Sequence, residues 1–217
     1  MKKKAVIIAP GRGTYNKDDL GYLRSHHQNV SIIKQFDEYR SSLGESTLTE
    51  LDGKDRYSIA IHTRGDNASP LIYTCALADF FAIDRKRFEI IGVTGNSMGW
   101  YTALACAGAL DPLAGLKVVN TMGALMHEEM IGGQLIYPIV DEEWQEIVGL
   151  RKSIPEKISA RNTRSDHNLA RSIVLGGMLV SAGDKEGLIA FEADVHQLPN
   201  RCQMRVHNHA VIHSKRP

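Results

Sequence analysis

The sequence has few cysteines, no long apolar run and no excess of either charge. Its three cysteines, Cys75, Cys106 and Cys202, are far apart and form no CxxC pair, which predicts free thiols in a reducing compartment and excludes a disulfide framework. No stretch approaches the roughly 18 consecutive apolar residues of a membrane span. We therefore expect a soluble, cytoplasmic protein.

The charges are balanced along a chain of moderate length. The 217 residues include 26 Lys and Arg against 25 Asp and Glu, a formal net charge of +1. Such a chain has no global field to attract nucleic acid or an anionic membrane, so we expect neither as a partner. The apolar run after Met1 to Lys4 is also shorter than the roughly 7–15 residues of a signal-peptide core. We expect one main domain with an insertion.

Short apolar runs alternate with segments of helical spacing. Residues 5–9 are apolar and end at a glycine-rich turn, which predicts a strand buried on both faces. Residues 88–94 are β-branched and apolar and predict a second strand. An α/β fold with a core like that of α/β-hydrolases, built on a parallel sheet, is the prediction. The helices expected to cover this sheet span residues 22–42, 70–83, 100–110 and 112–125.

The pattern changes after Gly132 and Gly133. The later segments predict the order strand, helix, strand, strand, helix, strand, which is the ferredoxin-like unit. We therefore expect a subdomain of residues 128–206 inserted into a core made of residues 1–127 and 207–217. Its predicted elements are a strand at 134–140, a helix at 141–153, a strand near Ile158, a strand at 172–181, a helix at 184–198 and a strand at 202–211.

A GxSxG pentapeptide, Gly95-Asn96-Ser97-Met98-Gly99, stands between the strand at 88–94 and the helix that follows. A serine hydroxyl is a poor nucleophile until it is presented clear of its neighbours and given a base. In this context the glycines relieve crowding in a sharp turn, and the helix N-terminus offers N–H groups to a developing oxyanion. Ser97 is thus the predicted nucleophile of an acyl-transfer enzyme, and the Met98 amide one oxyanion donor. The alternative is a serine that merely caps the helix.

A second oxyanion donor and a general base are needed as well. The loop Pro10-Gly11-Arg12-Gly13 follows the first strand, so the Arg12 amide suits the first role; an ordinary exposed turn is the alternative. Spacing does not choose the base among nine histidines. An HxHx3H pattern at 207–213 also resembles a zinc site, but no acidic or cysteine ligand stands beside it, so we expect no metal. The pair at 26–27 is expected to be solvated.

These residues resemble the malonyl-CoA:acyl-carrier-protein transacylases and the acyltransferase domains of polyketide synthases. The segment at 95–110 is similar to the family signature GHSxGEYTAL…AGAL, and residues 10–13 to its PGQG oxyanion loop. Residues 210–214, Ala-Val-Ile-His-Ser, resemble the segment that carries the catalytic histidine, and residues 175–183 with the βαββαβ order match the ferredoxin-like insertion.

The resemblance implies a Ser-His dyad and a ping-pong mechanism. Ser97 would accept the acyl group, His213 would act as general base and acid, and the amides of Arg12 and Met98 would form the oxyanion hole. The acyl group would come from acyl-CoA and pass to the phosphopantetheine of an acyl carrier protein, in fatty-acid or polyketide synthesis, with no cofactor of the enzyme's own. Family members continue well beyond the histidine, whereas four residues follow His213 here.

Several positions depart from the family pattern at residues expected to bind substrate. Asn96 stands where the family has histidine, and Arg12 where it has glutamine. Met122 stands where the family has the arginine that clamps the malonyl carboxylate, and a thioether cannot make that charge-assisted contact. Ser69 stands where the family has an active-site glutamine, and Asn67, two residues away, is a possible substitute for it. The acyl group is therefore left open between malonyl and neutral groups.

Three functions follow from these observations. The leading prediction is an acyltransferase acting between coenzyme A and an acyl carrier protein. An acyl-thioester hydrolase on the same fold, in which water resolves the acyl-serine, is the first alternative. A docking protein that keeps the fold with weak chemistry is the second.

Overall fold

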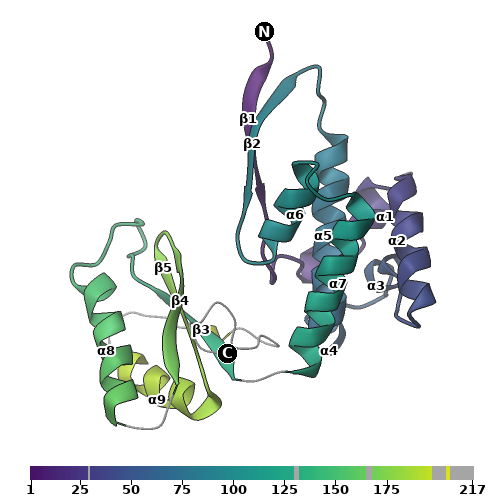
Figure 1. The fold of residues 1–217 in the computed structure, drawn as a ribbon. Coiled ribbons are helices and arrows are strands. Elements are labelled where there is room, and N and C mark those ends of the chain that lie inside the picture. Colours follow the sequence, from purple (N-terminus) through teal and green to yellow (C-terminus); the bar gives the residue numbers. More distant parts are fainter. Residues whose placement is uncertain (29, 130–131, 165–167, 197–203, 206–217) are drawn as a thin grey trace. The chain divides into compact units, whose positions relative to one another are not determined.

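The structure, a computed structural model, describes the chain except residues 29, 130–131, 165–167, 197–203 and 206–217 (Figure 1). It divides into two compact units, Met1–Met126 and His127–Pro217. The predicted return of residues 207–217 to the first unit lies outside the described residues.

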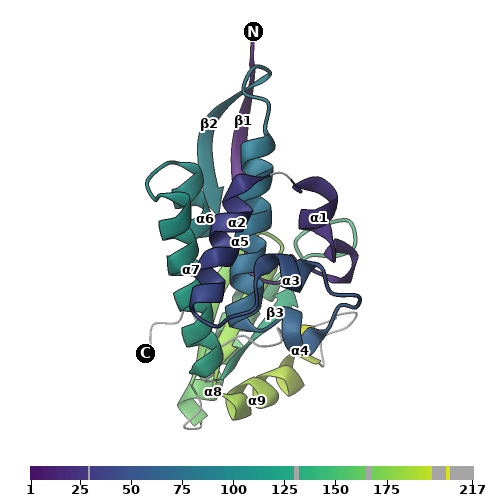
Figure 2. The same cartoon turned by 90° about the vertical axis from the view of Figure 1, so that its right-hand side faces the viewer.

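The first unit combines a parallel strand pair with helices. The α/β class and the parallel sheet predicted from the sequence are confirmed. Figure 2 shows α5 and α7 running side by side through this unit, with α2 in front of α5. The elements are β1 (Lys3–Ala9), a 3-10 helix η1 (Lys17–Asp19), α1 (Tyr22–His26), α2 (Ser31–Ser42), α3 (Leu48–Asp52), α4 (Ile59–His62), α5 (Gly65–Ala82), β2 (Phe88–Gly95), α6 (Gly99–Cys106) and α7 (Pro112–Glu128).

The two strands end together, which sets the place of the candidate site. β1 pairs with β2 in register from Lys3 opposite Phe88 to Ala9 opposite Gly95, with one register shift after Ala5. Helix α6 packs against both strands. The carboxyl ends of β1 and β2 and the start of α6 therefore meet at one edge of the sheet.

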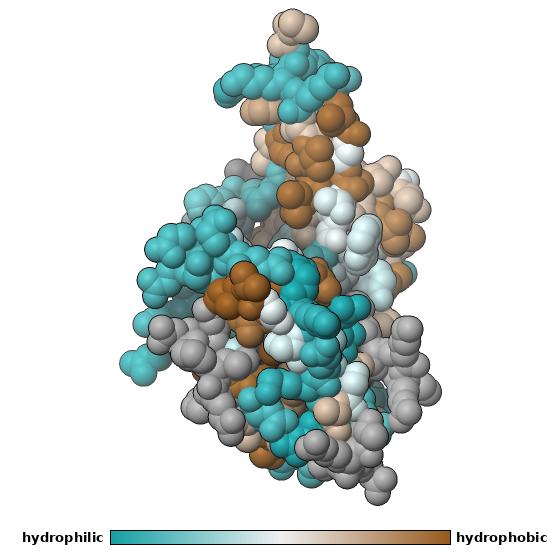
Figure 3. Space-filling view, turned by 90° about the vertical axis from the view of Figure 1, so that its left-hand side faces the viewer, coloured by the Kyte–Doolittle hydropathy of each residue, from teal (hydrophilic) through white to brown (hydrophobic). Residues whose placement is uncertain are grey.

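Within the described residues of the first unit, one face of this sheet is exposed, contrary to the prediction for residues 5–9. Ala9 is 3% exposed, but Val6 is 55% and Ile8 75% exposed, and Ile91 on β2 is 57% exposed. Figure 3 shows a brown, hydrophobic patch on the upper part of the surface, over β1 and β2. On the opposite face Ala5 and Ile7 are half-buried and Ala9 is buried, because neighbouring strand residues point to opposite faces.

Two predicted helices differ in their bounds. The helix expected over 22–42 is broken into α1 and α2, because the chain turns between His26 and Ser31. The helix expected to open at Pro70 begins at Gly65, so the proline lies inside it. The helix after Asp111 follows the prediction, because the Asp111 carboxylate accepts the N–H groups of Leu113 and Ala114 at 2.9 and 3.3 Å.

The second unit contains an antiparallel sheet with two helices. The strand order across the sheet is β4-β5-β3-β6. A buried core of apolar side chains, including Tyr137 and Phe191, joins β3, α8 and α9. The elements are β3 (Gly133–Pro138), α8 (Leu150–Arg164), β4 (Leu169–Leu175), β5 (Met178–Gly183), α9 (Lys185–His196) and β6 (Met204–Arg205).

Three local predictions for the second unit are wrong. Residues 141–149 precede the helix that was expected to begin at 141, and Ile158 lies in α8 instead of a strand. The single strand expected at 172–181 is a hairpin that turns at Gly176 and Gly177, where Gly176 has a φ of 53°.

Within the described residues, every helix is too short or too polar to traverse a bilayer.

Candidate active site

The predicted nucleophile lies in a sharp turn between β2 and α6. Ser97 has a φ of 52°, in the left-handed region that a non-glycine residue adopts at a cost of about 1 kcal/mol or more. Gly99 N–H donates to Asn96 O at 2.8 Å and Trp100 N–H donates to Ser97 O at 3.1 Å, so the turn runs directly into the helix. This strand-turn-helix backbone is the context in which a serine is presented as a nucleophile.

Two glycines provide the space that this turn needs. A Cβ on Gly95 would lie 2.2 Å from the backbone C and O of Gly99, and a Cβ on Gly99 would lie 2.3 Å from Ala9 O. The obstructing atoms belong to the backbone, so no side-chain rotation could relieve the clash. Glycine at both positions therefore allows α6 to begin against the end of β1.

The loop at residues 10–13 packs against the same turn. A Cβ on Gly11 would lie 3.0 Å from Asn96 O, and Asn96 N–H donates to Ala9 O at 3.4 Å. Met98 is the N-cap residue of α6, at the end of the helix where N–H groups have no helical carbonyl partner. The two segments predicted to supply oxyanion donors are thus neighbours in space.

The Arg12 side chain leaves this loop and reaches α5 and α7. Its Nη1 donates to Met126 Sδ at 3.9 Å and lies 3.1 Å from the position of a Cβ on Gly65. Burial lowers the pKa of Arg12 to about 10, and the Asp66 carboxylate opposes this shift only in part. The guanidinium is still charged at neutral pH, but it is a cation in a poorly hydrated place.

Helices α5 and α7 cross closely where the other predicted substrate-binding residues lie. A Cβ on Gly123 would lie 2.3 Å from Gly65 O and 3.2 Å from Ser69 Cβ. Ser69 is 2% exposed and faces α7, whereas Met122 is 37% exposed. Met122 is one helical turn before Met126 on α7, so it lies near the part of this helix that the loop after β1 reaches.

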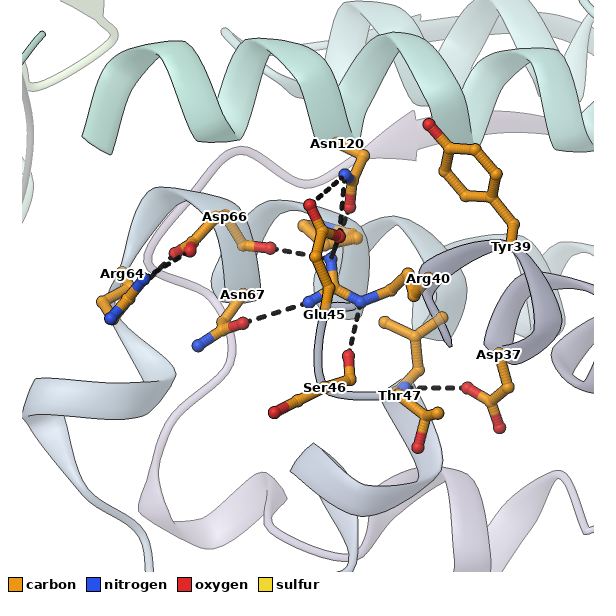
Figure 4. A network of polar contacts seen from close by, with 12 residues as sticks. Asp37, Tyr39, Arg40, Glu45, Ser46, Thr47, Arg64, Asp66, Asn67 and Asn120 are labelled. Carbon is orange, nitrogen blue, oxygen red and sulfur yellow. Dashed lines mark hydrogen bonds and ion pairs between the residues drawn. The ribbon is translucent and has the colours of Figure 1, made fainter. Parts of the chain in front are cut away.

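A buried arginine, which no spacing pattern in the sequence indicates, holds α2, α5 and α7 together (Figure 4). Arg40 is fully buried, and its Nη1 lies 3.0 Å from Glu45 Oε2. Its Nε donates to Ser46 O at 2.7 Å, and Nη1 also donates to Asn120 Oδ1 on α7. Asn120 Nδ2 donates in turn to the Glu45 carboxylate at 2.9 and 3.0 Å. The network fixes the distance between α2 and α7.

The proline inside α5 explains why Arg40 contacts that helix. Pro70 has no N–H, so the carbonyl of Asp66, four residues earlier, lacks its helical donor. Arg40 Nη1 donates to this carbonyl at 2.8 Å, and Nη2 donates to Asn67 Oδ1 at 3.1 Å. Asn67 Nδ2 donates to Ile61 O at 3.1 Å. Asn67, considered above as a substitute for a glutamine, therefore has both ends of its amide in contacts that hold the fold.

The predicted base, His213, and the rest of the HxHx3H pattern lie outside the described residues. Within the described part of the chain no cluster of three or more metal-binding side chains occurs. The prediction that His27 is solvated is wrong. His27 is 6% exposed, and its Nε2 lies 2.8 Å from Asp79 Oδ1. It follows the last residue of α1, where the chain turns inward.

A cavity of about 460 Å³ lies in the first unit along β1 and α5. Tyr22, Cys75 and Asp79 are among its lining residues. Tyr22 Oη donates to Asp79 Oδ1 at 2.9 Å. None of Ser97, Arg12 and Met122 lines this cavity, so the predicted chemistry does not use it.

One curated protein and several solved structures are similar to this chain. No protein-family model matches the chain. A curated malonyl CoA-acyl carrier protein transacylase of Haemophilus influenzae is 25% identical over 171 residues, which are 75% of this chain and 52% of the relative. The chain thus spans about half the length of that relative.

Solved structures show the same fold. A malonyl CoA-acyl carrier protein transacylase of Clostridium perfringens has a TM-score of 0.71 and 20% identity over 96% of this chain and 62% of that one. One of Burkholderia pseudomallei has a TM-score of 0.75 and 19% identity over 99% of this chain and 67% of that one. A malonyl-transacylase solved in complex with a type II polyketide synthase acyl-carrier protein has a TM-score of 0.67 and 22% identity over 95% and 63%. The resemblance to malonyl transacylases predicted from the sequence is therefore confirmed.

Proposed function

We propose that this chain carries the acyl-transfer centre of an acyltransferase that moves an acyl group, malonyl or related, from coenzyme A to an acyl carrier protein. The observation that supports this most strongly is the conformation of Ser97. Its positive φ sits in a turn where glycines make room for the start of a helix. A residue kept in this strained conformation is characteristic of a nucleophile that must stand clear of its strand.

The proposed reaction has two half-reactions. Ser97 Oγ attacks the thioester carbonyl while His213 takes its proton, and the amides of Arg12 and Met98 donate to the oxyanion. The tetrahedral intermediate collapses, the C–S bond breaks, and the proton on His213 passes to the coenzyme A thiolate. The phosphopantetheine thiol then gives its proton to His213 and attacks the acyl-serine ester. The new thioester forms as the proton returns to Ser97 Oγ.

Similarity supports the choice of donor and acceptor. The curated relative is named for malonyl CoA and acyl carrier protein, and one structural neighbour was solved with an acyl-carrier protein bound. Because this chain spans about half of that curated relative, the activity, substrates and partner of the whole protein are part of the proposal, as is its cytoplasmic location. Met122, Ser69 and Asn96 complete the proposed substrate-binding set.

The finer fold assignment belongs to the same proposal. The first unit would be an α/β-hydrolase-like core, and the second a ferredoxin-like subdomain. The element order from β3 to β6, with two helices and an antiparallel sheet in the order β4-β5-β3-β6, supports the second assignment.

Intact-protein mass spectrometry after brief incubation with malonyl-CoA, and separately with acetyl-CoA, tests the function. We expect a mass increase of one acyl group that disappears in Ser97→Ala and persists in Ser31→Ala, an exposed serine at the start of α2. No increase together with consumption of the thioester would favour the hydrolase. No increase with the thioester intact would refute the chemistry and favour the docking protein.

A further inference from the structure

Two short basic runs meet at the amino-terminal end of the strand pair. Residues 2–4 are three lysines, and residues 85–87 are Arg-Lys-Arg. The parallel pairing places Lys3 opposite Phe88, and Lys3 N–H donates to Arg87 O at 2.9 Å. Runs that are far apart in sequence therefore lie side by side. We call the six residues of the two runs the basic tip: Lys2, Lys3, Lys4, Arg85, Lys86 and Arg87.

Most of the charge of the basic tip is uncompensated. All six residues are exposed, and within the part of the chain that the structure describes none of them forms an ion pair. Two carboxylates are near. Asp84 accepts the Lys86 N–H at 2.8 Å, and Glu89 stands opposite Lys4 in the sheet. Positive charge is therefore concentrated at this end of the unit, although the formal net charge of the whole chain is only +1.

An apolar surface borders the basic tip. Lys4, Val6 and Ile8 lie on one face of β1, because alternate strand residues share a face. Val6 is 55%, Ile8 75% and Ile91 on β2 57% exposed. In Figure 3 a hydrophilic, teal region lies directly above the brown patch over these strands. Cations beside exposed apolar side chains are the combination that binds an anionic bilayer, because the cations meet the headgroups and the apolar groups enter the boundary with the acyl chains.

We propose that the basic tip and the apolar side chains of Val6, Ile8 and Ile91 bind the surface of an anionic lipid bilayer. A nucleic acid would use the cations but would leave the apolar side chains in water, so a lipid surface fits both halves of this face. Ser97 follows the carboxyl end of β2, about 20 Å along the strands from the basic tip. The inference uses none of the proposed site residues and is independent of the proposed acyl transfer.

Flotation of the whole chain with lipid vesicles tests this binding. One set of vesicles contains phosphatidylcholine alone, and the other an equal mixture of phosphatidylcholine and phosphatidylglycerol. We expect binding to the mixed vesicles that weakens as salt is added, because salt screens the attraction, and no binding to the neutral vesicles. Absence of binding to the mixed vesicles, or equal binding to both sets, would overturn the proposal.

Variants of the two basic runs measure the part played by charge. A Lys or Arg near an anionic surface strengthens binding by about five-fold. The combined variant Lys2→Gln, Lys3→Gln and Lys4→Gln should therefore weaken binding to the mixed vesicles roughly 100-fold. The pair Arg85→Gln and Arg87→Gln should weaken it roughly 25-fold. Native circular dichroism of both variants shows that the fold is kept.

The matched control removes as many charges from elsewhere in the first unit. Lys17→Gln, Lys34→Gln and Lys54→Gln together replace three exposed lysines, and we expect less than about a 3-fold change, because these positions lie outside the basic tip. An equal loss in the control would mean that only net charge matters and would overturn the proposal. Ile91→Gln should weaken binding roughly 10-fold, whereas Leu43→Gln, at a 51% exposed position after α2, should not.

Soluble polyanions distinguish a lipid surface from other acidic partners. Polyglutamate and duplex DNA carry negative charge but have no acyl boundary. We expect each to displace the chain from the mixed vesicles only at a large excess of charge. Displacement at equal charge, together with no effect of Ile91→Gln, would assign the face to an acidic protein or a nucleic acid and overturn the proposal. Ser97→Ala should float like the wild-type chain, so a failure of the proposed acyl transfer would leave this result unchanged.

Discussion

Replacing Arg40 by methionine tests whether one buried side chain holds the helices around the candidate site. Methionine is of similar length and apolar, so it fills the space but cannot donate. The substitution removes an ion pair with Glu45 at 3.0 Å. It also leaves the carbonyl oxygens of Ser46 and Asp66 without the donors now at 2.7 and 2.8 Å.

The expected loss of stability follows from these contacts. Removing one partner of a buried ion pair costs about 3–5 kcal/mol, because the other charge remains buried. Glu45 is 25% exposed, so water stabilises it in part and the lower end of the range applies. The Asp66 carbonyl cannot regain a helical donor, since Pro70 has no N–H. We therefore expect Arg40→Met to lower the free energy of unfolding by about 3 kcal/mol.

Urea unfolding followed by far-ultraviolet circular dichroism measures this loss. Arg24→Met, at an exposed position on α1, is the matched control and should change stability by less than about 0.5 kcal/mol. Adding Glu45→Gln to Arg40→Met should recover part of the loss, because it removes the unpaired charge. A loss below about 1 kcal/mol for Arg40→Met, or equal losses for the two arginine variants, would refute this account of the network.

Three further predictions concern the turn, the acyl group and a thiol. Gly99→Ala places a methyl 2.3 Å from Ala9 O, so we expect it to reduce the rate of Ser97 acylation at least 10-fold. Gly92→Ala meets only Val6 Cγ2, at 4.0 Å, and should reduce the rate far less; an equal effect in the two variants would contradict the packing argument. Met122→Arg should raise the ratio of malonyl to acetyl transfer measured by mass spectrometry, and an unchanged ratio would refute the alignment that places a substrate-facing residue there. Burial raises the pKa of the Cys106 thiol to about 11, which leaves about 100-fold less thiolate at pH 8 than the ordinary value of 9.0 gives. Alkylation of Cys106 by iodoacetamide should be slowed by about that factor and should accelerate with pH up to about 11. A rate equal to that of a free thiol would contradict this prediction.

The features that the sequence predicts best are those encoded by neighbouring residues. The strand at 88–94 and the GxSxG turn are predictable because an apolar run, a glycine pair and a small-residue helix follow one another between 88 and 110. The structure adds the reason for each glycine, since Gly95 and Gly99 are both in contact with backbone atoms. The Asp111 cap is local in the same sense, because its carboxylate binds amides two and three residues ahead.

Predictions failed where the outcome depends on distant contacts. Asp79 lies 52 residues from His27 in sequence, so helical spacing around 26–27 could not indicate burial. The start of α5 was missed because Pro70 is a frequent first residue of a helix, whereas here Arg40 supplies the donor that its ring removes. The hairpin at Gly176 is not predicted because both of its strands are apolar, and the sequence pattern therefore indicates one continuous strand.

The conformation of the Ser97 turn and the packing of α5 beside Arg12 depend on different parts of the fold. The turn of Ser97 is held by backbone contacts with Ala9 and Asn96, so it should tolerate changes in most side chains nearby. The Arg12 guanidinium instead lies against the start of α5, whose Asp66 carbonyl depends on Arg40. A conservative change such as Arg40→Lys should therefore lower the free energy of unfolding in urea before it weakens labelling of Ser97 by a fluorophosphonate. Parallel loss of both properties would mean that the α5 network also supports the nucleophile.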